Sequence, residues 1–335
     1  MSLNVLITAG SRRVALVQAF QRALAATGGG QVFVTDVNEL SPAVYIASRA
    51  YRAPLSTDPG YLDVIADLCQ TEQVGLVVPT IDDELPIFAR GRRRLERLGL
   101  RVAVSPIETT EICNDKWETC RRLTAEGVPA AETFLPGTLP DDPVFPLFIK
   151  PRVGRGGIGA FAVRDPRELE FFLGYVPHPI VQQYLHGPEF TIDVFCNFDG
   201  EPLSIVPRER VVIRAGVMDR GRTVRDHRLT DLAAACARAL RFAGAINIQC
   251  RIVDGTPVVF EINPRFSGGV PLTIAAGADF PRMLVDLARG AAVRPSIGRF
   301  KEGLWMTSYE ASMFLPAAAV GFSERTTLAH IPEVA

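Results

Sequence analysis

Hydrophobic residues in the first hundred positions follow two different periods. Segments 4–8, 32–35 and 74–78 are short apolar runs rich in valine, isoleucine and leucine, which is typical of buried strands. Segments 14–24 and 62–69 instead place apolar residues every three or four positions, as one face of a helix does. Strands that alternate with helices in this way predict a parallel sheet with helices on both faces, the βα arrangement of an α/β domain.

The pattern changes after Ser105-Pro106. A helical segment at 116–125 is followed by short strand-like segments, and Asp165-Pro166 has the N-cap and first-position proline of a helix start. The expected strands of this part are 145–150, 160–163 and 180–184.

Strands dominate the next part of the chain. Asp254-Gly255 is a strong signal for a tight hairpin between two of them. The expected strands are 190–195, 202–206, 246–253 and 258–262, with a helix at 231–242 and two more helical patterns within 270–290. The sequence therefore predicts a mixed α/β and α+β chain with divisions at 1–105, 106–185, 186–295 and a C-terminal segment 296–335.

Composition limits the classes of partner. Lysine and arginine number 36 and aspartate and glutamate 37, so the net charge of −1 gives no general attraction to nucleic acid or to a membrane surface. No apolar run reaches the roughly 18 residues that span a bilayer, and residues 1–10 lack a signal-peptide pattern. Six cysteines without a C-x-x-C pair suggest buried thiols in a reducing compartment. We therefore expect a cytoplasmic protein, for which a homodimer is a possible assembly.

A lysine precedes a loop that is rich in glycine. Lys150-Pro151 ends a predicted strand, and four of the six residues in 154–159 are glycines. Backbone N–H groups of such a loop can approach an anion closely, and the ammonium can neutralise it, which would suit a triphosphate. The alternative is a flexible hairpin loop beside a solvated lysine, and both interpretations stay open at this point.

A second candidate site carries oxygen atoms. Glu261 and Asn263 lie two positions apart on a predicted strand and so share a face, and the hairpin can bring Gln249 beside them. Oxygen side chains of this kind, completed by phosphate oxygens, are what Mg²⁺ prefers. Arg265 would then lie close enough to meet phosphate with its planar guanidinium. The alternative is a polar strand end in solvent.

Two further segments are weaker signals. Residues 181–189 could offer backbone groups to an adenine edge and a carboxylate, Glu189, to a ribose. Residues 207–228 hold seven arginines interleaved with acidic residues, which argues against a nucleic-acid stripe and leaves a solvated face or a substrate clamp. The clamp residues we favour are Arg208, Arg210 and Arg214.

The first division has its own candidates. Thr8 to Arg12 and Asp36 follow strands at the edge where open parallel sheets bind ligands. A dinucleotide site is disfavoured because the first turn lacks G-x-G-x-x-G. Residues 80–84 could bind substrate or cap the next helix, and the cap is favoured.

The order of these motifs resembles the ATP-grasp superfamily, and in particular single-module relatives of the carbamoyl phosphate synthase large subunit. The motifs are Asn114-Asp115-Lys116, Lys150-Pro151 with its glycine loop, Gln183-Tyr184-Leu185 with Glu189, and Gln249 followed by Glu261-x-Asn263-x-Arg265. The likeness covers roughly residues 1–290. It implies a βα domain ahead of a two-part ATP-grasp fold, in which a small part bears a lid and a larger part bears the metal.

The resemblance also implies roles for individual residues. Phosphate contacts would come from Lys116, Lys150, Gly156 and Gly157, and nucleoside contacts from the 183–185 backbone, including Gln183 and Leu185, and from Glu189. Gln249, Glu261 and Asn263 would hold Mg²⁺, with Mn²⁺ as an alternative, and Lys150, Asn263 and Arg265 would serve phosphoryl transfer. Gln183 and Gln249 depart from the acidic residues that many members have there.

The implied activity is ATP-dependent ligation of a small-molecule carboxylate to an amine through an acyl phosphate, with ADP as a product. Three alternatives remain: a synthetase-like module that phosphorylates bicarbonate or carbamate, a nucleotide-binding regulator without turnover, and an NAD oxidoreductase.

Overall fold

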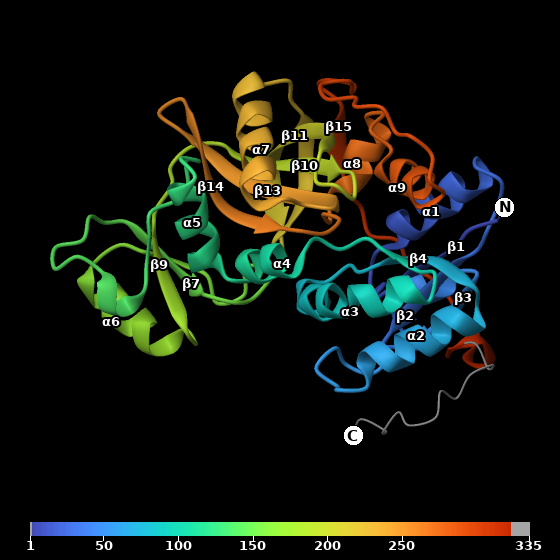
Figure 1. Cartoon of the computed structure of the whole chain (residues 1–335). Helices are drawn as coiled ribbons and strands as arrows, with labels where there is room; N and C mark the ends of the chain where they lie inside the picture. The colour runs from blue at the N-terminus through green and yellow to red at the C-terminus, as the bar shows by residue number, and fades with distance from the viewer. Residues whose placement is uncertain (1, 323–335) are drawn as a thin grey trace. The chain divides into compact units, whose positions relative to one another are not determined.

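The computed structural model describes residues 2–322, and its helices and strands are labelled in Figure 1. The chain forms two compact units. The first comprises residues 2–107, Asp279–Arg294 and 309–322 of the described chain, and the second comprises Glu108–Ala278 and Pro295–Ser308.

The first unit is built on a parallel five-stranded sheet in the order β3-β2-β1-β4-β5. Its strands are β1 (Asn4–Ile7), β2 (Val32–Asp36), β3 (Arg49–Arg52), β4 (Val74–Val78) and β5 (Arg101–Val102). Helices α1 (Val14–Ala25) and α9 (Phe280–Ala288) pack together on one face, and α2 (Tyr61–Thr71) and α3 (Leu85–Arg97) cover the other (Figure 1). The predicted α/β arrangement is confirmed, including a helix after residues 80–84, although the short edge strands β3 and β5 were not foreseen.

Helix α9 changes the expected division of the chain. The sequence pattern assigned it to a part that ran from 186 to 295, but it belongs to the first unit. The reason is its apolar face: Phe280, Leu284 and Val285 are fully buried, and the helix packs along α1.

A buried carboxyl connects three elements of the first unit. Glu84 accepts hydrogen bonds from the hydroxyls of Thr8 (2.6 Å) and Tyr61 (2.7 Å). Burial raises the pKa of Glu84 to about 7. We expected residues 80–84 to cap the next helix. Glu84 is the N-cap residue of α3, but its side chain makes no capping hydrogen bond and binds the Thr8 and Tyr61 hydroxyls instead.

The Asp36 carboxylate binds backbone N–H groups of the first unit. It accepts hydrogen bonds from Ser11 (2.6 Å) and Asn38 (2.9 Å). Both carboxylate oxygens, which a dinucleotide ribose would need as acceptors, therefore already have partners within the protein.

The second unit contains two antiparallel sheets. The smaller has the order β6-β9-β7-β8, and its strands are β6 (Thr133–Phe134), β7 (Leu147–Pro151), β8 (Phe161–Val163) and β9 (Pro179–Gln183). Helix α6 (Pro166–Tyr175) packs beside β8 and begins as predicted, because the Asp165 carboxylate accepts the N–H groups of Arg167 and Glu168. Helices α4 (Ile107–Asn114) and α5 (Lys116–Ala125) precede this sheet.

The larger sheet has the order β14-β13-β10-β11-β12-β15. Its strands are β10 (Glu189–Cys196), β11 (Pro202–Arg214), β12 (Val217–Thr223), β13 (Gly244–Val253), β14 (Thr256–Asn263) and β15 (Trp305–Thr307). Helix α7 (His227–Leu240) buries its apolar face against β10, β11 and β14, and α8 (Val270–Ala275) lies near β12. The sequence predicted a strand of only five residues at 202–206, but β11 continues through the arginine-rich stretch and turns back as β12.

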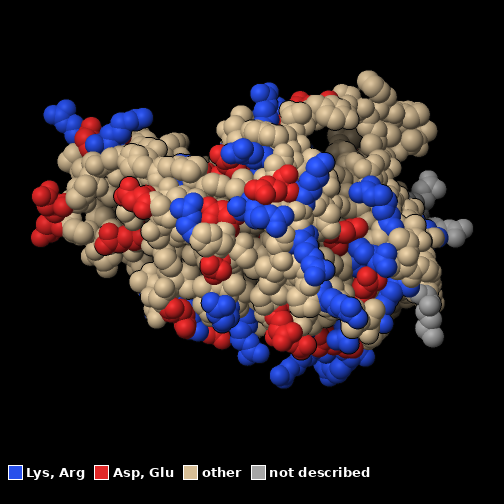
Figure 2. Space-filling view, turned by 90° about the horizontal axis from the view of Figure 1, so that it is seen from above, with Lys and Arg blue, Asp and Glu red and all other residues tan. Residues whose placement is uncertain are grey.

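Other sequence expectations can be compared with the described chain. All six cysteines are buried with free thiols. Within residues 2–322 no helix has both the length and the apolar character needed to cross a bilayer. On the face seen in Figure 2, acidic and basic side chains lie interspersed.

Candidate active site

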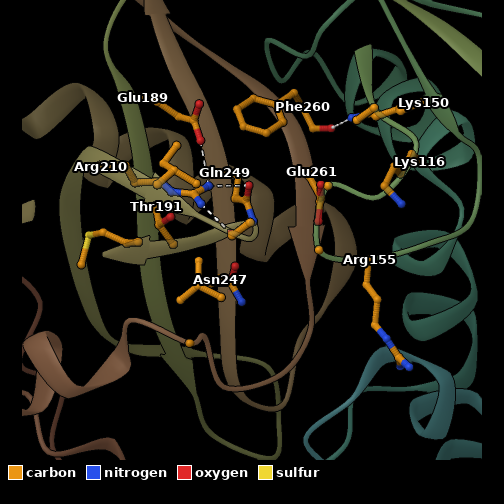
Figure 3. A pocket seen from close by; sticks show the side chains of 18 of the residues that line it. Lys116, Lys150, Arg155, Glu189, Thr191, Arg210, Asn247, Gln249, Phe260 and Glu261 are labelled. Atoms are coloured by element: carbon orange, nitrogen blue, oxygen red, sulfur yellow. Dashed lines mark hydrogen bonds and ion pairs between the residues drawn. The ribbon is translucent and has the colours of Figure 1, made fainter. Parts of the chain in front are cut away.

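A cavity of about 550 Å³ lies in the second unit, lined by residues of both of its sheets. Its walls come from β7, the end of β9, strands β10, β11, β13 and β14, and residues 154–159, called here the glycine loop. In the view of Figure 3, Lys116 and Lys150 lie on one side, Glu189 and Arg210 on the other, and Glu261 between them.

Lys150 is a buried cation in this wall. It is the fourth residue of β7, paired with Ile180 of β9, and only 5% of it is exposed. Its Nζ donates to the Phe260 carbonyl (3.2 Å) and lies 5.5 Å from the centre of that ring. Burial lowers the pKa of Lys150, and the charge of Glu261 opposes this shift. A desolvated ammonium of this kind gains from an anionic ligand, because the ligand would offset the cost of its burial.

Lys116 holds the start of the glycine loop. Its Nζ donates to the Gly154 carbonyl (2.6 Å), and its backbone N–H donates to the Arg152 carbonyl (3.1 Å). Gly156 and Gly157 have φ near +70°, a left-handed backbone that suits glycine. Hydrogen bonds from Lys116 therefore hold the start of the glycine loop, and the glycines that follow give its backbone conformational freedom.

The oxygen-bearing residues meet across two strands. Gln249 on β13 lies directly opposite Glu261 on β14, and Asn247 lies opposite Asn263. The Asn263 amide donates to Glu261 (3.1 Å), and its oxygen accepts from Arg265 (3.1 Å). Arg265 and Glu261 line the cavity, while Asn263 lies behind them and is buried.

This donor set fits Mg²⁺ in its chemistry, since it offers one carboxylate and amide oxygens beside space for phosphate. Among residues 2–322, no group of three or more His, Cys, Asp or Glu side chains could hold a metal. A divalent ion here would thus depend on amide and phosphate oxygens in addition to Glu261.

Glu189 and Gln249 share one cationic partner. The Nη1 of Arg210 donates to the Glu189 carboxylate (2.7 Å) and to the Gln249 amide oxygen (2.9 Å). Its Nη2 donates to the Gly216 carbonyl (2.7 Å), and Arg251 donates to the other oxygen of Glu189. Burial lowers the pKa of Arg210, and Glu189 opposes the shift.

The expected adenine side is formed by the end of β9. Gln183, Tyr184 and Leu185 line the cavity, and Tyr184 lies against Phe148 with ring centres 6.4 Å apart. The Gln183 N–H donates to the Glu132 carbonyl, so this donor is already used within the protein.

The three arginines predicted as a substrate clamp have different surroundings in the structure. Arg208 is 1% exposed, and its guanidinium donates to both oxygens of Asp193 (2.8 and 2.9 Å) and to Ser267 (3.0 Å). Arg214 lies outside the cavity lining and pairs with Asp219 (3.0 Å) where its side chain is 57% exposed. Arg208 and Arg210 both line the cavity, but the guanidinium of Arg208 is held by Asp193, whereas Arg210 contacts the candidate ligand-binding residues Glu189 and Gln249.

The strand pairing just before Arg214 is irregular. Strand alternation would put Arg208, Arg210 and Arg214 on one face. The pairing of β11 with β12 skips Val211 on β11 and then Asp219 on β12, however, and beyond both irregularities Ile213 lines the cavity. Simple alternation therefore does not extend through this part of β11, and Arg214 lies outside the cavity lining.

Among the lining residues that sequence reasoning missed are Asn247, Thr191 and Phe260. Alternation along the strands could have found Asn247, two positions before Gln249, and Thr191, two positions after Glu189. Phe260 receives Lys150 through its backbone carbonyl, for which a sequence carries no signal.

Comparison with known proteins identifies two families along the chain. Residues 176–311 match a family described as "ATP-grasp in the biosynthetic pathway with Ter operon". Residues 5–103 match the "PylC-like, N-terminal domain".

A curated relative is the carbamoyl phosphate synthase arginine-specific large chain of Bacillus subtilis (strain 168). It is 27% identical over 270 residues, which are 74% of this chain and 25% of the relative. The matched region thus spans about a quarter of that protein.

Solved structures share the fold. A biotin carboxylase from Campylobacter jejuni superposes with a TM-score of 0.72 at 14% identity, over 90% of this chain and 74% of that one. An L-amino acid ligase from Bacillus licheniformis gives 0.69 at 20% identity, over 88% and 77%. These likenesses agree with the two-sheet architecture of the second unit. Over residues 176–311 the chain matches the ATP-grasp superfamily of enzymes, and a PylC-like domain at residues 5–103 precedes this region.

Proposed function

We propose that this chain is an ATP-dependent ligase that activates a small-molecule carboxylate as an acyl phosphate for attack by an amine. The observation that carries the proposal is the juxtaposition, around one cavity, of the buried Lys150 ammonium, the glycine loop and the opposed pair Gln249 and Glu261. Phosphoryl transfer from ATP requires buried positive charge, a loop that can cover the phosphates, and oxygen ligands for a divalent metal ion.

The proposed nucleotide contacts follow the two sides of the cavity. Lys116 and Lys150, with Gly156 and Gly157 of the glycine loop, would contact the phosphates. Gln183, Leu185 and Glu189 would face the nucleoside, with Leu185 the better backbone donor because the Gln183 N–H is occupied.

Glu261, Gln249 and Asn263 would hold Mg²⁺ or Mn²⁺, and a bound ion supplies positive charge to the phosphate oxygens. Arg265 lines the cavity beside them and would meet the transferred phosphoryl group with its planar donors. Because Arg208 is neutralised by Asp193, we do not assign it to the substrate.

The chemistry proceeds in two steps. A carboxylate oxygen attacks the γ-phosphorus of ATP, and the bond to the β-phosphate oxygen breaks to release ADP. The amine nitrogen then attacks the acyl carbon, loses a proton, and displaces inorganic phosphate to form an amide. Lys150 and Arg265 would offset the charge of the transferred group, and the glycine loop would keep water from the acyl phosphate.

In this proposal residues 106–185 are the small lid-bearing part, and the metal-bearing part runs from 186 to 278. The L-amino acid ligase among the similar structures makes amino acids reasonable first carboxylates to test. A second candidate is phosphorylation of bicarbonate or carbamate, favoured by the identity with the carbamoyl phosphate synthase large chain.

The experiment is steady-state ADP release across a panel of organic carboxylates and amines, with bicarbonate as a separate arm. Stimulation that needs both an organic carboxylate and an amine would support the ligase. Stimulation by bicarbonate alone would favour the second candidate. Measurable ATP binding without stimulation by any substrate would count against both and favour a regulator.

A further inference from the structure

The glycine loop touches the tip of the β11–β12 hairpin. A Cβ added to Gly216 would lie 2.8 Å from the carbonyl carbon and oxygen of Gly156 and 2.9 Å from its Cα. Contacts of this length do not occur between real Cβ atoms and backbone, so the approach depends on the absence of a side chain at position 216. The two backbones therefore meet directly.

Apolar side chains surround this contact. Ile213 and Val217 flank the hairpin turn and are 42% and 40% exposed, while Ile158 of the glycine loop is 79% exposed. All three line the cavity. Apolar groups on both partners would lose solvent contact if the loop settled further onto the tip.

Arg210 connects the same tip to the opposite side of the cavity. One of its terminal nitrogens donates to the Gly216 carbonyl, and the other donates to Glu189 and Gln249 (Figure 3). The Arg210 side chain is only 4% exposed and therefore closely packed. A movement of Glu189 or Gln249 would therefore shift Arg210 and, through it, the backbone at Gly216.

We propose that residues 213–217, the hairpin tip, form the docking surface on which the glycine loop closes, and that Arg210 is the positioning residue that ties this surface to Glu189 and Gln249. The Arg210 guanidinium now donates a hydrogen bond to the Gln249 amide oxygen (2.9 Å). A divalent ion bound to the same oxygen would repel the guanidinium, because both are positively charged and would lie within a few ångströms of each other. Ligand binding and loop docking would then be linked through one side chain. This link rests on the proposed function, whereas the docking itself does not.

The chain offers a matched pair of variants for docking. Residues Ala215-Gly216 (φ 47° and 74°) and Asp254-Gly255 (φ 47° and 82°) are two hairpin turns with nearly the same left-handed backbone. A Cβ on Gly216 would strike Gly156, but a Cβ on Gly255 would meet only the Arg228 guanidinium at 3.9 Å. Gly216→Ala and Gly255→Ala therefore carry similar backbone strain, and only the former obstructs the loop.

The measurement is the rate of trypsin cleavage after Arg155 in the nucleotide-free full chain. We expect Gly216→Ala to accelerate cleavage about fivefold and Gly255→Ala to leave it unchanged, since cleavage follows the population of the open loop. An unchanged rate in Gly216→Ala, or equal acceleration in both variants, would overturn the docking surface. Neither result depends on whether a ligase substrate is found.

Arg210→Lys tests the link. Lysine keeps the charge but cannot span three acceptors with a planar fork. We expect faster cleavage after Arg155 without a matching fall in the denaturant midpoint of the whole chain, and a smaller protective effect of Mg-ADP than in the unaltered protein. A variant that loses global stability but keeps the normal cleavage rate and protection would assign Arg210 a purely structural role and refute the link.

Discussion

Gln249 on β13 and Glu261 on β14 face each other across the strand pair at the wall of the cavity. Because one is neutral and the other charged, only Glu261 can compensate the charge of a cation at this position. The two residues should therefore contribute unequally to metal dependence.

Replacement of Glu261 by glutamine should lower metal-dependent ATP turnover by about 100-fold or more, the size of effect seen when a single electrostatic stabiliser is lost. ADP release measured against Mg²⁺ concentration checks this. Glu170→Gln, on the exposed face of α6, is the control and should behave as the unaltered protein. Retained turnover in Glu261→Gln would refute the metal assignment.

Lys150 should make nucleotide affinity depend on pH. Burial places its pKa below the ordinary lysine value, so the protonated form that attracts phosphate is lost as pH rises through this lowered pKa. We expect ADP affinity, measured by calorimetry between about pH 7 and 10, to fall with rising pH and this fall to vanish in Lys150→Met. The exposed Lys301 provides the control Lys301→Met. The same pH profile in Lys150→Met and the unaltered protein would exclude the role.

Nucleotide should protect the glycine loop. Phosphates would give the loop additional partners, so Mg-ADP should slow trypsin cleavage after Arg155 several-fold. Cleavage after the exposed Arg241, at the end of α7, serves as the internal reference and should not respond. Equal rates at Arg155 with and without nucleotide would contradict a phosphate-covering loop.

Arg208 and Arg214 should differ sharply in their effect on stability. Arg208→Met leaves Asp193 buried without its partner, which costs about 3–5 kcal/mol of unfolding free energy. Arg214→Met breaks a pair whose arginine is largely exposed, for which less than about 1 kcal/mol is expected. Denaturant unfolding compares the two, and similar small losses would mean that Arg208 is not structural.

Glu84 should make the stability of the first unit depend on pH. Its pKa of about 7 in the folded chain exceeds the ordinary 4.5, so the folded state holds a proton that the unfolded state has released between these values. Stability should therefore fall as pH rises from 4.5 to 7 and level off above, by a total on the order of 3 kcal/mol. Unfolding measured across this range should lose the slope in Glu84→Gln and keep it in Glu96→Gln, which removes the partner of Arg92.

Local periodicity was enough to predict much of this protein. The alternation of strand and helix in residues 4–78, the hairpin at Asp254-Gly255 and the cap at Asp165 all appear in the structure. Each depends on neighbours a few positions apart, whose preferences the chain carries with it. The order of the motifs from Lys116 to Arg265 also indicated the superfamily, because the order of these chemical groups along the chain can be read without knowledge of the fold.

Tertiary structure decided what depends on distant partners. The pairing of β11 with β12 is irregular at Val211 and Asp219, just before Arg214 leaves the cavity lining, and no alternation rule within β11 could foresee this, because it depends on β12. Arg208 meets Asp193, 15 positions away, and Arg210 meets Gln249, 39 positions away. A guanidinium has the same sequence signature whether its fork faces a ligand or a buried carboxylate, and only the folded chain determines which of them neutralises its charge.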